Sequence, residues 1–391
     1  MRLGTCIAVE AVVILAALSG ATWGATRLAA EWRGPDAEPR ITLDLRPPRP
    51  LPPPPGARAP VPPTNVSASR SPSAAGAPSG VAATATVAIA PVPAAGDPLA
   101  PVWRFGDVDD AQLLAPLRAG RPARVKVNRG GTSLSLRLDL DNGARGAFKP
   151  DQVFGQSNPR REIAAYRIDR LLGIGRVPPA IPVTYTLDEL IAAVDPGDGE
   201  ARTRLRTDTR PRGAELRGEL SWWVPVLADA RISGARIDET DGIVTWRAWL
   251  KAGAKIPPDR VGLCQQLSTM TLFDFVIDNT DRWTGNNAKV SADGAVLYFM
   301  DNTLAFGKNR RGHDKSHRYL QRVQTFSRRL VARLRALDEA QLRAVLADAG
   351  PFERLLTDEE IAAVLGRRDR ALAYVDGLIA THGEAKVLAF P

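Results

Sequence analysis

The sequence predicts an α+β fold with two unequal lobes, a small and mainly antiparallel β lobe followed by a larger helical lobe. Two patterns predict it. Short runs in which apolar and polar residues alternate lie between 124 and 150, and helical spacing of apolar residues dominates after 228. Strands first and helices second is the order expected of an α+β domain with a cleft between its two parts.

Composition divides the 391 residues into three parts. Residues 1–30 contain an almost wholly apolar or small stretch and are expected to be a signal peptide or a single transmembrane anchor. Residues 31–100 are rich in Pro, Ala, Gly and Ser, so they are expected to form a disordered linker. The remaining part, 101–391, is long enough for a substantial core, and we place its N-lobe at about 101–227 and its C-lobe at about 228–391. We therefore expect an exported or membrane-anchored protein that reaches the membrane through its N-terminal segment.

The formal net charge of +9 suggests a nucleic-acid partner. However, the cations are mostly arginines scattered through the expected helices and loops, as on a solvated basic face. We expect no specific nucleic-acid partner, while an acidic substrate or an anionic membrane surface stays open.

The first elements of the expected N-lobe are strands. Alternation at 125–127 and 134–140 indicates two strands, and Gly130 and Gly131 between them indicate a hairpin turn. A third short strand is expected to end at 147–150. Helical spacing then predicts a helix over 161–172. A further strand is expected at 220–227.

Helices dominate the expected C-lobe. Residues 261–277 are apolar enough to form a buried helix. A short buried strand is expected at 296–300. Apolar residues from 320 onward recur at helical spacing and predict one amphipathic helix over 320–346.

Three polar residues of the expected C-lobe match the needs of phosphoryl transfer, which depends on positioning and on charge neutralisation. Asp281 is the candidate carboxylate near an attacking hydroxyl. Asn286, five residues later, has the catalytic-loop interval of protein kinases and is a candidate metal ligand. Asp301 directly follows a buried strand, where an acid needs a partner or a cation, and is the second candidate metal ligand. Taken singly, an ion pair of Asp281 with the next arginine and an ordinary Asn turn are equally good accounts.

The N-lobe offers candidates for binding nucleotide phosphates. Lys149 ends an expected strand and Glu162 lies one turn into the following helix, where a kinase places its strand lysine and helix glutamate. Asp169 lies on the same helical face and could also point toward the cleft. Gly130 and Gly131 lie where a glycine loop covers phosphates, although Gly-Gly more often marks a plain hairpin.

Other chemistries are less well supported. The histidines at 313 and 317 have helical i, i+4 spacing, but no glutamate lies between them and Cys264 has no neighbouring cysteine. A solvated pair is therefore favoured over a zinc site.

Two stretches resemble the secretory-pathway kinase family typified by the Golgi casein kinase and the four-jointed kinase. The first comprises 146–150, 161–172 and 176–179, and the second comprises 274–282 with 301–302 and 306–307. The resemblance implies a two-lobed protein-kinase-like fold that uses ATP with Mg²⁺ or Mn²⁺. It also implies that Lys149 contacts phosphate, that Glu162 supports that lysine or the metal, and that Asp281 is catalytic while Asp301 binds metal.

The sequence departs from that family at the catalytic loop, where Trp283 follows Asp281-Arg282 in place of the usual histidine. The following Thr-Gly-Asn resembles the loops of lipid kinases and HipA-type kinases. The structural disulfides of the secretory-pathway family also have no counterpart in this sequence. We expect a kinase that phosphorylates a hydroxyl group of a protein or glycan acceptor. The alternatives are an inactive, kinase-like nucleotide-binding scaffold and a lipid or small-molecule kinase.

Overall fold

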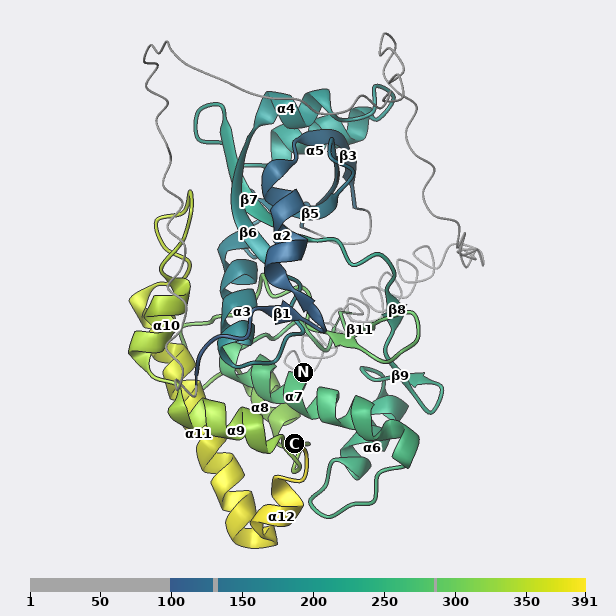
Figure 1. The fold of residues 1–391 in the computed structure, drawn as a ribbon, viewed down its shortest axis with the longest axis vertical. Coiled ribbons are helices and arrows are strands. Elements are labelled where there is room, and N and C mark those ends of the chain that lie inside the picture. Colours follow the sequence, from purple (N-terminus) through teal and green to yellow (C-terminus); the bar gives the residue numbers. More distant parts are fainter. Residues whose placement is uncertain (1–98, 129–132, 285–286) are drawn as a thin grey trace, which may run out of the picture. The chain divides into compact units, whose positions relative to one another are not determined.

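The computed structural model describes residues 99–128, 133–284 and 287–391. All of them belong to one compact unit, Val87–Pro391. Figure 1 shows a sheet with helices beside it in the upper half of this unit, and a group of helices in the lower half. The predicted α+β class, with antiparallel strands first and most of the helices after them, is confirmed.

A five-stranded antiparallel sheet forms the first half. Its strand order is β3-β4-β5-β7-β6, so β7 inserts between β5 and β6. The strands are β3 Pro122–Val127, β4 Leu136–Leu140, β5 Arg145–Pro150, β6 Ala180–Thr186 and β7 Glu215–Trp222. Alternation in β4 buries three leucines and leaves the two polar residues between them half-buried, as the sequence predicts for a half-buried strand.

Three helices accompany the sheet, and one more lies between the sheet and the helical half. The three are α2 Asp110–Ala119, α4 Leu187–Ala192 and α5 Gly199–Asp208. The fourth, α3 Pro159–Leu171, begins with Asn158 accepting from the backbone N–H of Arg160 and with proline in the first turn, a favourable start for a helix. Because α3 packs against β6, β7 and α10, it connects the sheet to the helical half.

The helical half is built around α7 Val261–Ile277, which has the predicted bounds. Nearly every residue in its last ten is buried, as expected of a helix that is apolar all round. The other helices of this half are α6 Thr240–Trp249, α8 Asp314–Leu320, α9 Arg328–Ala336, α10 Glu339–Leu346, α11 Asp358–His382 and α12 Glu384–Val387, with a 3₁₀ turn at Pro258–Arg260. Of these helices, α8 and α11 pack against α7. In three small sheets, β1 Arg104–Phe105 pairs with β2 Val108–Asp109, β9 Arg231–Ile232 pairs with β10 Ala235–Arg236, and β11 Lys289–Val290 lies between β12 Leu297–Tyr298 and β8 Ala228–Asp229.

The prediction of one helix over 320–346 is wrong. This range holds the end of α8, then α9 and α10. Two helix starts interrupt it, because Ser327 and Asp338 each accept a hydrogen bond from a backbone N–H three residues later. The apolar spacing stays in phase across both breaks, so periodicity alone does not reveal them.

Two predicted strands have different bounds in the structure. The strand expected at 220–227 is β7, which begins and ends five residues earlier. The strand expected at 296–300 is reduced to the two residues of β12.

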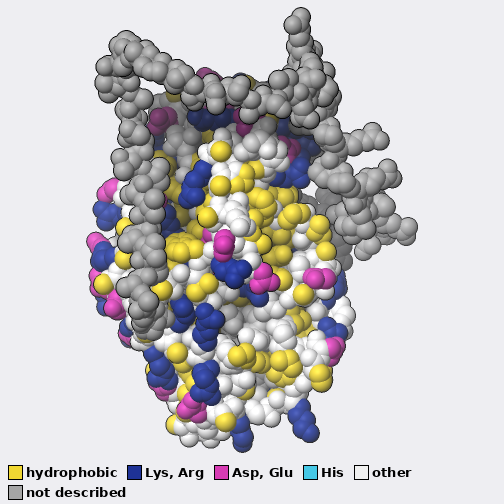
Figure 2. Space-filling model, viewed as in Figure 1, with side chains coloured by type: hydrophobic (Ala, Val, Ile, Leu, Met, Phe, Trp, Pro, Cys, Tyr) yellow, Lys and Arg dark blue, Asp and Glu magenta, His cyan; other side chains and the backbone are white. Residues whose placement is uncertain are grey.

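The N-terminal predictions, 1–30 as signal peptide or anchor and 31–100 as linker, lie outside the described residues except for their last two positions. Within the described ranges, no helix is long and apolar enough to cross a membrane. Cys264 is buried and unbridged. On the face seen in Figure 2, Lys and Arg are interspersed with Asp and Glu.

Candidate active site

Lys149 lies where the sheet, α3 and the helical half meet. Its Nζ lies 2.5 Å from Glu162 Oε1 and 2.9 Å from Asp301 Oδ1. The side chains of Lys149 and Glu162 are only 15% and 9% exposed. Although burial alone disfavours the ammonium ion, Asp301 and Glu162 raise the pKa of Lys149 above its ordinary value. The Lys149 side chain therefore stays protonated, and it connects acids that lie far apart in the sequence.

Glu219 is a further acid beside Lys149 that we did not predict. It lies directly opposite Lys149 in the β5–β7 ladder, so both side chains are on the same face of the sheet. It is 2% exposed. Burial, followed by the charge of Glu162, raises the pKa of Glu219 to about 8, although Lys149 opposes this shift. The Glu219 carboxyl therefore keeps its proton to a higher pH than an exposed glutamate does.

The loop after α7 holds Asp281 in place. Asp278 ends the helix in the left-handed region, at φ 57°, which Asp tolerates better than most residues. Asn279 then accepts from the backbone N–H of Asp281 at 3.0 Å and donates to the carbonyl of Asp301 at 3.2 Å. One asparagine thus connects the two acidic segments of the site.

The Asp281 carboxylate accepts hydrogen bonds from its own loop. Thr284 Oγ1 donates to Oδ1 at 2.5 Å and Asn287 Nδ2 donates to Oδ2 at 2.9 Å. The side chain of Lys315, on α8, also attracts Asp281 electrostatically. These contacts fix the orientation of the carboxylate, which is half-buried at the edge of the site.

The residue after Asp281 is structural. Arg282 is fully buried, and its Nε lies 3.0 Å from Asp274 Oδ2. Its Nη2 donates to Asn302 Oδ1 at 2.8 Å. Burial raises the pKa of Asp274 to about 6, with Arg282 opposing. The surface ion pair between Asp281 and Arg282 that the sequence left open is not formed.

Asp301 also has a left-handed backbone, with φ 57°. Lys149 beside it holds the pKa of Asp301 below its usual value. The next residue, Asn302, donates to Glu162 Oε2 at 3.1 Å and accepts from Asn279 at 3.1 Å. A continuous hydrogen-bond network thus runs from α3 to the loop that carries Asp281.

These residues surround a cavity of about 330 Å³. Lys149, Glu162, Glu219 and Asp301 line its polar part. Its other lining includes a mainly apolar group of residues: Ala147, Val177, Ala180, Trp222, Val224, Leu227 and Met300. Asp281 lies at its border, bonded to Asn287, which does line it.

Some predicted residues are not brought to this site or are not described. Asn286, Gly130 and Gly131 lie outside the described residues. Asp169 does not point into the cleft: it is fully buried and accepts from Arg170 and from the backbone N–H groups of residues 175–177. His313 accepts from the backbone of Lys315 at the start of α8.

The carboxylates of this site fit a metal ion that is bound partly by the protein and partly by substrate phosphates. Across the described ranges, no group of three or more His, Cys, Asp or Glu side chains could hold a metal by itself. Mg²⁺, however, is usually bound by one or two carboxylates together with substrate phosphates. Asp301 and Glu162 supply two carboxylates at the polar end of the cavity.

The sheet order, the helix glutamate bonded to the strand lysine, and the acids after α7 and β12 define a two-lobed, kinase-like α+β protein. No protein-family model matches the chain. Curated proteins and solved structures do match the chain, and they indicate which group of kinases it resembles.

The chain is 25% identical over 319 residues to a glycosaminoglycan xylosylkinase of Danio rerio, which covers 71% of this chain and 77% of that protein. It is 25% identical over 248 residues to the human extracellular serine/threonine protein kinase FAM20C, but this match spans only 41% of FAM20C. The resemblance stated from the motifs is thus confirmed: the chain is related to the secretory-pathway atypical kinases.

Solved structures confirm the kinase-like fold. The Golgi casein kinase aligns with a TM-score of 0.55 at 17% identity, covering 71% of this chain and 78% of that one. The same kinase with Mn and ADP bound also gives 0.55. Hydra Fam20 with sugar gives 0.54 at 18% identity, covering 74% and 95%.

Proposed function

We propose that this protein is a kinase that uses ATP and Mn²⁺ or Mg²⁺ to transfer the γ-phosphoryl group to a hydroxyl of a protein or glycan. The observation that carries the proposal is the position of Lys149, bonded at once to Glu162 from α3 and to Asp301 from a segment 152 residues further along the chain. The relatives, a xylosylkinase and a serine/threonine kinase, support the glycan and protein acceptors respectively.

Lys149 is proposed to bind the phosphates of ATP. Glu162 holds the ammonium from one side, so its charge stays at the polar end of the cavity as negative charge develops on the transferred group. Asp301 is proposed to bind the metal, with Asn286 as the expected second ligand. When bound, the metal neutralises phosphate charge and orients the phosphates.

Asp281 is proposed to orient the acceptor hydroxyl and to take its proton. The bonds from Thr284 and Asn287 keep its oxygens at the border of the cavity. A fixed carboxylate beside the attacking oxygen supplies positioning, the main protein contribution to phosphoryl transfer.

The apolar part of the cavity is proposed to hold the nucleobase. Ala147 on β5 and Ala180 on β6 are small residues on either side of β7, and Met300 directly precedes Asp301. A flat, apolar base fits this wall while its phosphates extend toward Lys149.

The test is transfer from γ-labelled ATP with Mn²⁺ to protein, glycan and lipid acceptors offered in parallel. Asp281→Asn and Asp301→Asn are expected to lower the rate by about a hundredfold or more, since each removes a group that stabilises the transition state. Asp376→Asn, which changes an exposed acid on α11 paired with Arg335, is the matched control and is expected to retain the rate.

The alternatives predict different results. Metal-dependent nucleotide binding without transfer to any acceptor indicates an inactive scaffold. Labelling confined to the lipid fraction indicates a lipid kinase. Absence of nucleotide binding contradicts the proposal and the scaffold alternative together.

We also propose that residues 1–30 direct the protein into the secretory route or anchor it in a membrane, that 31–100 is the linker, and that 101–391 is the catalytic domain. The secretory-pathway relatives support this arrangement. Protease digestion of intact cells tests it: the domain is expected to be cleaved only from the non-cytoplasmic side. Digestion from the cytoplasmic side contradicts the export proposal but not the kinase proposal.

A further inference from the structure

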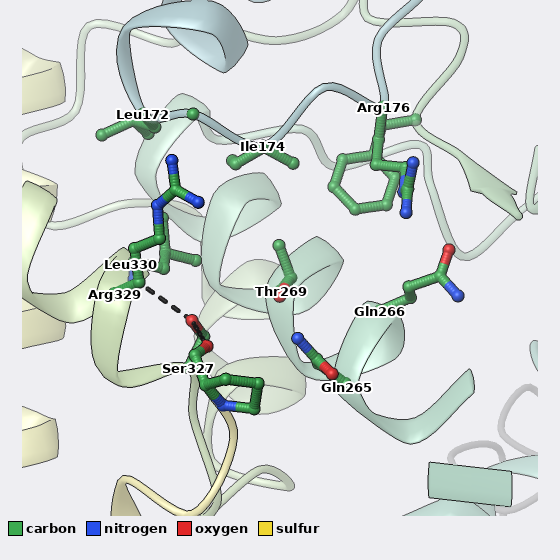
Figure 3. Close-up of a pocket in the computed structure, with 12 residues that line it drawn as sticks. Leu172, Ile174, Arg176, Gln265, Gln266, Thr269, Ser327, Arg329 and Leu330 are labelled. Carbon is green, nitrogen blue, oxygen red and sulfur yellow. Dashed lines mark hydrogen bonds between the residues drawn. The ribbon is translucent and has the colours of Figure 1, made fainter. Parts of the chain in front are cut away.

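A second cavity, of about 280 Å³, lies below the C-terminal end of α3, between α7 and α9. None of its lining residues lines the cavity at Lys149. Figure 3 shows Arg176 and Arg329 on two sides of it, with Thr269 and Gln265 between them. Leu172, Ile174 and Leu330 form apolar parts of the wall.

Over the described residues, neither the Arg176 nor the Arg329 guanidinium forms a hydrogen bond or an ion pair. This contrasts with the neighbouring Arg333, which donates to the carbonyl of Leu171 at 2.8 Å. Each guanidinium carries five N–H donors in a fixed fork, so two of them leave many donors facing one small cavity.

The acids around Arg176 do not satisfy it. Asp169 attracts it, but the Asp169 oxygens already accept from Arg170 and from backbone N–H groups that include that of Arg176 itself. Asp107 attracts it too, and is exposed. Burial is the largest influence on the Arg176 guanidinium and lowers its pKa, as expected of a desolvated cation without a close counter-ion.

The remaining polar side chains add neutral donors. Gln265 and Thr269 face the cavity from α7 (Figure 3). Pro391, the last residue of the sequence, also lines it, and a terminal oxygen of Pro391 accepts from Ser327 Oγ at 2.5 Å. No Asp or Glu side chain is among the residues that line this cavity, and the terminal group of Pro391 on the Ser327 side is the acidic group beside it. Planar guanidinium forks match the oxygens of tetrahedral oxyanions, to which they donate in pairs.

We propose that this cavity is a second binding site, which takes an oxyanion of the phosphate or sulfate type, either free or carried on a small molecule. Arg176 and Arg329 bind the oxyanion from opposite sides, and Thr269 and Gln265 donate additional hydrogen bonds. The site is independent of the proposed kinase function, because it shares no lining residue with the nucleotide cavity.

The site also contacts the segment that leads to Asp301. Phe299 lines the cavity, and its backbone N–H donates to the carbonyl of Arg176 at 3.1 Å. Gln266 accepts from the Leu297 N–H and donates to the Ala295 carbonyl, both at 2.8 Å. An oxyanion bound here is therefore next to the strand that precedes the proposed metal ligand, without entering the nucleotide cavity.

The test is titration of the protein with sodium sulfate and sodium phosphate, with sodium chloride at equal ionic strength as reference, followed by thermal unfolding. Wild type is expected to show a saturable rise in Tm with sulfate and phosphate and none with chloride. Arg329→Gln is expected to weaken binding at least tenfold. It changes an exposed side chain that forms no hydrogen bond or ion pair with the described residues, so it is expected to fold and keeps the test valid if Arg176→Gln does not.

Two controls locate the binding. Arg370→Gln, which changes an exposed arginine on α11, is expected to retain the rise in Tm. Lys149→Met, which removes the cation of the nucleotide cavity, is also expected to retain it. A rise that disappears in Lys149→Met but persists in Arg329→Gln places the oxyanion in the nucleotide cavity and overturns the proposal. A rise equal to that in chloride, or none, overturns it as well.

Discussion

Replacing Lys149 by methionine tests the structural and the catalytic parts of the account at once. Methionine keeps most of the length and apolar stem of lysine but removes the ammonium. Glu162, whose side chain is 9% exposed, is then left as a buried carboxylate without its cation. Asp301, 40% exposed on its side chain, regains water more easily.

The expected loss of stability follows from that burial. Removing one partner of a buried ion pair costs about 3–5 kcal/mol, because the remaining charge is uncompensated. For a domain of this size, each kcal/mol lowers Tm by roughly 2–4 °C, so a fall of about 6–20 °C is expected without nucleotide. Lys308→Met is the control. Its pair with Glu359 is 66% and 67% exposed, so the substitution is expected to leave stability nearly unchanged.

The double variant Lys149→Met/Glu162→Gln separates the two roles. Neutralising Glu162 removes the uncompensated charge, so most of the lost stability is expected to return. Activity is expected to stay at least about a hundredfold below wild type, since the phosphate-binding cation is still absent. Thermal unfolding and phosphate transfer are both measured on wild type, Lys149→Met, Lys149→Met/Glu162→Gln and Lys308→Met.

Two results refute this reasoning. If Lys149→Met unfolds at the same temperature as Lys308→Met, the ion pair with Glu162 is not formed in solution. If the double variant regains transfer together with stability, Lys149 has only a structural role and the nucleotide assignment fails.

Three further predictions follow from the same network. The pKa of Glu219 in the folded protein is about 8, above its usual 4.5, so the folded state binds this proton more tightly than the unfolded state does. The stability that this proton contributes is therefore lost as pH rises from about 4.5 to 8. Urea denaturation at pH 5 and pH 8 should show a smaller fall in stability for Glu219→Gln than for wild type, and an equal fall speaks against the raised pKa. Arg282→Leu should cost about 3–5 kcal/mol by leaving Asp274 buried without its cation, with most of it recovered in Arg282→Leu/Asp274→Leu; a loss below 1 kcal/mol is incompatible with the buried pair. Chelation of divalent metal should abolish the rise in Tm caused by ADP. Added Mn²⁺ should restore this rise in wild type but not in Asp301→Ala. Restoration in both proteins argues against Asp301 as the metal ligand.

The sequence predicts the parts of the fold whose pattern is local. The bounds of α7 are correct because its apolar residues surround the whole helix and end at Asp278. The meeting of Lys149 and Glu162 follows from a strand that ends just before a helix start. The ion pair between Lys149 and Asp301 is not predicted by the sequence, since no periodicity connects residues 152 positions apart.

Other features could not be predicted because they depend on packing. Glu219 is invisible as a site residue until the order β5-β7-β6 places it opposite Lys149. Asp169 has the same helical spacing as a cleft residue, but the turn after α3 folds back and its N–H groups surround the carboxylate. The long helix α11 does carry a local signal that we missed, the reciprocal capping bonds of Thr357 and Glu360.

The most direct measurement is a crystal structure with Mn²⁺ and ADP bound, with anomalous diffraction recorded at the manganese edge. The account predicts an anomalous peak bonded to an Asp301 carboxylate oxygen, with the phosphates in contact with Lys149 Nζ and the base against Ala147 and Met300. Manganese or nucleotide bound away from Asp301 and Lys149 would contradict it.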